Sequence, residues 1–153
     1  MERSVLEEAI YNRYIVPTRR KRTHLAGLEF ELPIVNEKNE PVNFEVIYQV
    51  TDRFIDTFSF LNVSRDDNEH IYLAVDDKTG DGLSYDCSYN TLEFSFGKEE
   101  DMNVLYKRFC QYYTYIQKEL RKEGHMLTGI GINPRYAVNQ NVPVVSERYR
   151  MLF

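Results

Sequence analysis

The stretch Ala26-Gly27-Leu28-Glu29-Phe30-Glu31-Leu32-Pro33 alternates apolar with small or acidic side chains. A period of two predicts a β-strand, covering about residues 24–35, with both glutamates on one face and the apolar side chains on the other. Two residues at ~3.3 Å each place the glutamates about 7 Å apart along the strand. Such a carboxylate pair suits a hard divalent cation, which prefers oxygen ligands, but it also fits the solvated face of a one-sided sheet.

A second acidic stretch lies at residues 83–96, where apolar and polar residues alternate again toward its end. Glu93 belongs to the polar set. Asp86 precedes it by seven residues, and an odd separation puts two side chains on opposite faces of one regular strand. If both acids serve one site, a bend is required, and Ser88-Tyr89-Asn90 has a suitable composition for it.

Four acids, Glu29, Glu31, Asp86 and Glu93, thus belong to expected strands, and a cluster of them would need a counter-cation to limit mutual repulsion. Four carboxylates favour magnesium or manganese that also carries substrate phosphates. Two of them could instead perform acid–base chemistry, as in glycoside hydrolysis. The chain has no Walker-type Gly-Lys-Ser/Thr loop, so metals and basic residues would have to hold any phosphates.

Other elements follow from spacing and turn residues. Helices are expected at about residues 4–15, 43–61, 99–123 and from 146 onward, and further strands at 71–75 and 125–133. Residues 62–70 read as a polar loop. Gly129 and Gly131, inside the last of these strands, predict close approach of a ligand or another backbone.

The chain has 153 residues, two cysteines and a net charge of −5. One domain over residues 1–153 is expected, with residues 1–24 as an N-terminal helix and a basic linker. The acidic balance favours neither nucleic acid nor an anionic membrane as partner. No apolar run is long enough to cross a bilayer, and the N-terminus does not resemble a signal peptide. Two free thiols are typical of the cytoplasm, which is the expected location.

Four ordered segments resemble a known family: GLEFELPI (27–34), YDCSYNTLEFSFG (85–97), LTGIGINPRY (127–136) and ERYRML (147–152). Together they are similar to the N-terminal half of glutamate–cysteine ligase (γ-glutamylcysteine synthetase) and its carboxylate–amine ligase relatives. The resemblance implies an α+β fold with a mostly antiparallel sheet and helices packed on one face, part of a glutamine-synthetase-like catalytic fold. It implies a role in glutathione biosynthesis: ATP phosphorylates the γ-carboxylate of glutamate, and the amine of cysteine attacks the acyl phosphate.

The resemblance also implies roles for single residues. Glu29 and Glu31 match the family's first pair of magnesium-binding acids, and Asp86 and Glu93 match the second pair. Asn133 falls near a position where the family has His or Gln beside the metal or nucleotide.

Arg148 and Arg150 could meet a substrate carboxylate or phosphate, although arginine in a helix more often forms a surface ion pair. No catalytic residue is assigned. Mg²⁺ or Mn²⁺ is the implied cofactor, and ATP a substrate.

The sequence stops inside an amphipathic segment, at Phe153. We therefore expect the N-terminal portion of a longer ligase, whose C-terminal half would be its partner. Alone, these residues should be inactive and could form a homodimer. Two alternatives stay open: a carboxylate–amine ligase with another amine acceptor, and a non-catalytic module whose acids only form a polar sheet face.

Overall fold

The computed structural model describes residues 4–19, 23–85, 87–135 and 143–151. It is an α+β fold built on one antiparallel sheet of six strands in the order β2-β3-β4-β5-β1-β6. The strands are β1 (Ala26–Asn36), β2 (Asn62–Arg65), β3 (Ile71–Val75), β4 (Gly82–Tyr85), β5 (Thr91–Glu99) and β6 (His125–Leu127). The helices are α1 (Val5–Ile10), η1 (Tyr11–Ile15), η2 (Val16–Arg19), α2 (Phe44–Phe58), α3 (Met102–Lys122) and α4 (Glu147–Arg150).

The strand expected at residues 24–35 is β1, and it connects two parts of the sheet. Its first part, Ala26–Pro33, pairs with β5, whereas Ile34–Asn36 pairs with β6. Apolar and polar side chains alternate in burial up to Glu31, and every residue from Leu32 onward is buried. The change accompanies the switch of partner from β5 to β6, because β6 and the loop after it cover this part of the strand.

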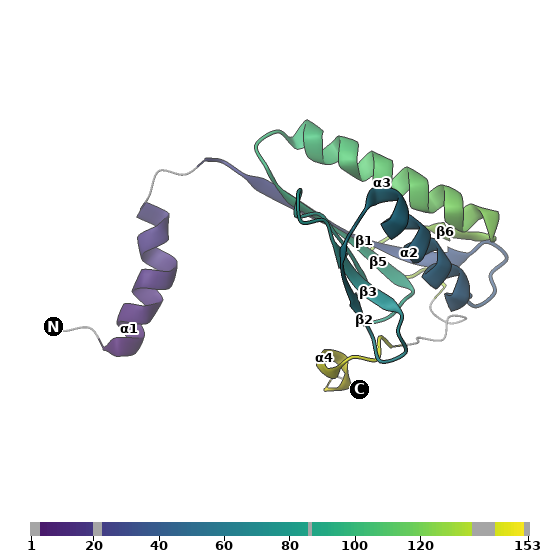
Figure 1. Ribbon diagram of the computed structural model, residues 1–153, viewed down its shortest axis with the longest axis horizontal. Coiled ribbons are helices and arrows are strands. Elements are labelled where there is room, and N and C mark those ends of the chain that lie inside the picture. Colours follow the sequence, from purple (N-terminus) through teal and green to yellow (C-terminus); the bar gives the residue numbers. More distant parts are fainter. Residues whose placement is uncertain (1–3, 20–22, 86, 136–142, 152–153) are drawn as a thin grey trace.

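Helices α2 and α3 lie side by side on one face of the sheet (Figure 1). The core forms between them and the strands, and it is aromatic, as a chain with 12 Tyr, 9 Phe and no Trp requires. Phe54 of α2 lies 5.4 Å from the Tyr112 ring of α3 and 6.1 Å from the Phe94 ring of β5, measured between ring centroids. The side of β5 that carries Phe94 therefore faces the helices, and its other side faces away from them.

A buried carboxylate ties α3 to the sheet. Asp81 is fully buried and accepts hydrogen bonds from the Gly97 N–H (2.9 Å) and the Tyr112 hydroxyl (3.0 Å). The Arg108 Nε lies 2.9 Å from the same carboxylate, and Arg108 also donates to Glu99 at 2.8 Å. Burial, followed by the charge of Asp81, raises the pKa of Tyr112, which therefore stays a neutral donor.

Three sequence predictions about the strands are wrong in detail. Residues 83–96 form the two strands of a β4–β5 hairpin rather than one bent strand. The loop expected at 62–70 contains β2, whose polar residues pair with β3. The strand expected at 125–133 ends at Leu127, since the glycines that follow lie in an exposed loop. A Cβ on Gly129 or Gly131 would meet nothing within 4 Å, so neither marks a close approach of another backbone in the described chain.

The N-terminal helical unit, made of α1, η1 and η2, stands apart from the sheet (Figure 1). A capping box begins it, as predicted, because the Ser4 hydroxyl accepts from the Glu7 N–H and the Glu7 carboxylate accepts from the Ser4 N–H. None of its residues is buried, and it contacts no other helix or strand of the described chain. Among the described helices, none is both long and apolar enough to cross a membrane.

Candidate functional site

Three of the four acids predicted on strands, Glu29, Glu31 and Glu93, share the sheet face that the helices leave open. Register places Glu31 directly opposite Glu93, and Glu29 opposite Ser95. Glu29 and Glu31 alternate with residues of the helix-covered face, as Glu93 does with Phe94. Side chains directly opposite each other in an antiparallel pair have Cβ atoms about 5 Å apart. The sheet therefore brings three carboxylates from two neighbouring strands onto one surface.

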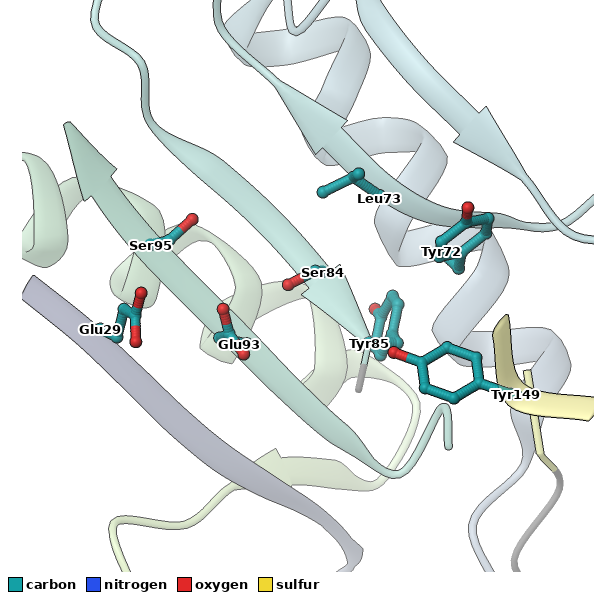
Figure 2. A pocket seen from close by; sticks show the side chains of 8 residues that line it. All are labelled: Glu29, Tyr72, Leu73, Ser84, Tyr85, Glu93, Ser95 and Tyr149. Atoms are coloured by element: carbon teal, nitrogen blue, oxygen red, sulfur yellow. The ribbon is translucent and has the colours of Figure 1, made fainter. Parts of the chain in front are cut away.

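Glu29 and Glu93 line a cavity of about 390 Å³ on this face. Figure 2 shows both side chains on the same side of the sheet, with Ser95 and Ser84 beside them. The cavity lining comprises Glu29, Tyr72, Leu73, Ser84, Tyr85, Glu93, Ser95 and Tyr149. It has an acidic and hydroxyl-rich part over β1, β4 and β5, and a part formed by tyrosines.

Sequence reasoning missed the hydroxyl and phenol groups of this cavity. Ser95 follows Glu93 by two residues, so the same alternation could have placed it on the acidic face. Ser84 could not be placed in that way, because its position opposite Glu93 depends on the β4–β5 hairpin. The tyrosines carry no local signal that separates a cavity wall from the core.

Tyr149 reaches the cavity because the C-terminal segment packs against the sheet. Val144 donates its N–H to the Cys87 carbonyl at 3.0 Å, and the Val145 carbonyl accepts from the Asp67 N–H at 2.9 Å. A β-bridge also joins Pro143 to Ser88. These backbone contacts fix the start of α4, and Tyr149 is only 4% exposed as a result.

Tyr85 is held in place from the helix side of the sheet. Its hydroxyl forms a 2.6 Å hydrogen bond with the Thr51 hydroxyl of α2, and Thr51 in turn donates to the Ile47 carbonyl. Burial raises the pKa of Tyr85, so its phenol is neutral over the physiological range. The phenol of Tyr85 therefore lies on the helix side of the sheet, and Tyr85 borders the cavity where β4 ends.

A second hollow, of about 410 Å³, adjoins Glu29 at the start of β1. It is lined by Gly27, Leu28, Glu29, Phe96 and Lys98. Glu29 therefore lies between a cavity with another carboxylate and a hollow with an ammonium group. The Lys98 ammonium group is therefore within reach of an anionic ligand bound beside Glu29.

The other predicted site residues fall outside the cavity or outside the described chain. Asp86 is not among the described residues. Arg148 and Arg150 belong to α4, but their side chains are not among the described ones. Asn133 donates its amide to the Ile34 carbonyl at 3.5 Å, and its carbonyl oxygen accepts from the Arg135 N–H at 2.9 Å. These bonds hold the loop after β6 against β1, and Asn133 does not line the cavity.

The carboxylates of the acidic face suit a cation that keeps several water ligands better than one held by protein side chains alone. Within residues 4–19, 23–85, 87–135 and 143–151, no three or more His, Cys, Asp or Glu side chains form a group that could hold a metal. Magnesium, however, keeps several waters and is usually held by one or two carboxylates together with substrate phosphates. Glu31 opposite Glu93, with Glu29 next along the strand, fits that pattern.

No protein-family model, curated protein or solved structure matches this chain.

Proposed function

We propose that this chain forms the acid-lined sheet of an ATP- and Mg²⁺-dependent glutamate–cysteine ligase-like enzyme, within a glutamine-synthetase-like catalytic fold. Such an enzyme makes a γ-glutamyl amide bond through an acyl phosphate. The observation that carries the proposal is the convergence of Glu29, Glu31 and Glu93 on the open sheet face, beside a cavity large enough for a small-molecule ligand. The sequence resemblance supplies the reaction.

In this proposal the three glutamates hold Mg²⁺ or Mn²⁺, which would neutralise phosphate charge during phosphoryl transfer. Glu31 and Glu93 bind from opposite strands, and Glu29 binds from the next position on the same face. Their placement on paired strands fixes the spacing of the carboxylates before any ligand arrives, and fixed spacing is what orientation-dependent catalysis requires.

The remaining groups of the two hollows position substrate. Ser84 and Ser95 offer hydroxyl donors next to the carboxylates, and the Lys98 ammonium is available to an anionic oxygen beside Glu29. Tyr149, which reaches the cavity from the C-terminal segment, closes the far end and limits the size of the bound molecule. Arg148 and Arg150 are proposed contacts of a substrate carboxylate or phosphate, and Asn133 of the metal or nucleotide.

The test is an assay of ADP release by the full-length protein that carries this chain, with Mg²⁺, ATP, glutamate and a panel of amines that includes cysteine. We expect ADP release that needs both glutamate and an amine, and a large loss of it in Glu29→Gln with little change in stability. The matched control is Glu45→Gln, which changes an exposed acid on α2. Wild-type turnover in Glu29→Gln at saturating Mg²⁺ would exclude the role given to Glu29.

A non-catalytic acidic-sheet module is the second candidate. The absence of a three-ligand metal group from the part of the chain that the structure describes favours it. The two candidates predict different results. A polar sheet face needs no divalent cation, and its acids can be replaced without loss of an enzymatic activity.

A further inference from the structure

A β-bulge near the end of β5 reverses which of its side chains face the helices. Leu28 of β1 pairs with Phe96 of β5. Two residues before Leu28, Ala26 pairs with Glu99, so β5 has one residue more than β1 between the two pairs. An extra residue moves the side chains that follow it to the opposite face of the sheet. The bulge therefore predicts Glu99 on the helix side and Lys98 on the acidic side.

Contacts on both faces agree with this assignment. On the helix side, Arg108 of α3 donates to the Glu99 carboxylate at 2.8 Å. On the other side, a Cβ on Gly27 would lie 4.0 Å from the Lys98 Cγ. Gly27 precedes Glu29 by two residues in the alternation of β1 and shares its face. The stem of Lys98 therefore lies on the acidic face, although the even-numbered residues earlier in β5 face the helices.

The bulge is held in place by the buried carboxylate network. Gly97, which lies inside it, donates its N–H to Asp81 at 2.9 Å, and Arg108 donates to the Gly97 carbonyl oxygen at 3.4 Å. Because Asp81 is fully buried, these bonds fix the backbone of the bulge from the helix side. The face on which Lys98 lies is therefore set by the core of the fold.

Lys98 borders the hollow of about 410 Å³ at the start of β1, and Glu29 lines the same hollow. Within the described residues, no carboxylate oxygen lies within 4.0 Å of the Lys98 ammonium group. Gly27 contributes no side chain to the hollow, which leaves space beside the lysine stem. An exposed ammonium group without an ion pair can bind an anion without first giving up a partner.

We propose that Lys98 and this hollow form a phosphate subsite that fills once a cation occupies the acidic face. The inference rests on the proposed function for that cation. Without the cation, the charge of Glu29 repels an anion in the hollow. With the cation bound, the same position lies between a divalent cation and an ammonium group, and both attract an oxyanion. A phosphate group fits this position because its several oxygens can contact the cation and Lys98 together.

Calorimetric titration of inorganic phosphate into the chain, with saturating Mg²⁺ or with EDTA, tests the subsite. Coupling between the two ligands predicts phosphate binding at least about tenfold tighter with Mg²⁺. Lys98→Met should weaken phosphate binding in Mg²⁺ about tenfold, because it removes a charge-assisted hydrogen bond. Lys98→Arg keeps the charge and should stay within about threefold of wild type. The matched control is Lys38→Met, which removes an exposed lysine from the turn after β1 and should leave the affinity unchanged.

Mn²⁺ binding, followed by electron paramagnetic resonance, separates this inference from the proposed function. Lys98→Met removes a positive charge near the cation, so it should bind Mn²⁺ at least as tightly as wild type. A wild-type chain that binds Mn²⁺ but no phosphate would overturn the subsite alone. A chain that binds neither would overturn both the subsite and the cation site.

Three further results would overturn the subsite: equal phosphate affinity of wild type and Lys98→Met, equal losses in Lys98→Met and Lys38→Met, or phosphate binding no tighter in Mg²⁺ than in EDTA. Acetate titrated in place of phosphate tests the chemical class of the ligand. Acetate that binds more tightly than phosphate would assign the hollow to a carboxylate and contradict the phosphate assignment.

Discussion

Glu31 and Glu93 are the residue pair whose placement is hardest to explain by stability alone. Like charges directly opposite each other on paired strands are destabilising, and the described residues give Glu31 no ion pair. A face that only needed to be soluble could alternate lysine with glutamate at these positions. The local arrangement is instead the one that a cation would stabilise.

Glu31→Gln should therefore stabilise the metal-free protein. Removing one of two facing charges is expected to raise the free energy of unfolding by about 0.2–1 kcal/mol at low salt. The gain should shrink in high salt, where screening already weakens the repulsion between the two carboxylates. Urea denaturation at two ionic strengths measures both effects, and a loss of stability in Glu31→Gln would show that the two acids do not repel.

Asp81 is the opposite case, an acid that stabilises the fold. Asp81→Ala leaves the Gly97 N–H, the Tyr112 hydroxyl and the Arg108 guanidinium without their shared acceptor. Because these groups stay buried, the free energy of unfolding should fall by about 3 kcal/mol.

Asp77 provides a control in the same turn, since it is exposed and no contact of it is described. Asp77→Ala should change stability by less than about 0.5 kcal/mol. Equal effects of the two substitutions in urea denaturation would contradict the role given to the buried carboxylate.

At the scale of elements, β5 passes so close to the turn after β3 that only glycine fits at position 97. A Cβ on Gly97 would overlap the Thr79 carbonyl, which is backbone and cannot rotate away. Gly97→Ala should destabilise the protein by at least about 2 kcal/mol, because the strand or the turn must shift.

Gly129 provides the matched comparison, because a Cβ there meets no atom within 4 Å. Gly129→Ala should lie within about 0.5 kcal/mol of wild type. Thermal denaturation of the two variants, measured side by side, tests this difference. A Gly97→Ala variant as stable as wild type would mean that the turn is not packed against β5.

The N-cap of α3 predicts a dependence of stability on pH. The Asn103 N–H donates to the Asp101 carboxylate at 2.8 Å, and this bond, with a second one from the Asn103 side chain, lowers the pKa of Asp101. A carboxyl whose pKa is lower in the folded state stabilises the fold above its unfolded pKa, about 3.9, and loses this contribution as the pH falls through the folded value.

Asp101→Ala should therefore be less stable than wild type at pH 7, and the difference should narrow as the pH falls below about 4. Asp101→Asn keeps an oxygen acceptor without the charge, so its own capping contribution should not change with pH. Urea midpoints measured from pH 7 down to pH 3 provide the data. A difference between wild type and Asp101→Ala that stays constant over this range would contradict the assignment.

Some elements were predictable from sequence and others were not, for physical reasons. The alternation around Glu29 and Glu31 identifies a strand because one side of β1 packs on the core, and the three- and four-residue spacing of apolar residues identifies α2 and α3 for the same reason. β2 was missed because three of its four residues, Asn62, Ser64 and Arg65, are polar, and pairing with β3 rather than burial defines it. Across the β4–β5 turn the apolar residues change from odd positions (Leu83, Tyr85) to even positions (Leu92, Phe94). The hairpin was missed because such a change also fits a bend within one strand.

At the scale of the whole molecule, the two faces of the sheet differ in what covers them. α2 and α3 bury the apolar face, while among the described residues only the C-terminal segment that brings Tyr149 to the cavity covers the acidic face (Figures 1 and 2). The two-residue alternation of the sequence predicted that Glu29, Glu31 and Glu93 lie on the polar side of their strands. It could not predict the cavity, because the contacts of residues 143–145 with 67 and 87–88 join segments far apart in the chain.

The central claim is that the open face binds a divalent cation through Glu29, Glu31 and Glu93, and a Mn²⁺ titration followed by electron paramagnetic resonance tests it most directly. The account predicts a Mn²⁺ site in the wild-type chain that is lost or greatly weakened in Glu93→Gln. The site should be unchanged in Asp56→Asn, which removes an exposed acid from α2 on the other side of the sheet. Equal Mn²⁺ binding by wild type and Glu93→Gln, or no binding by either, would contradict it.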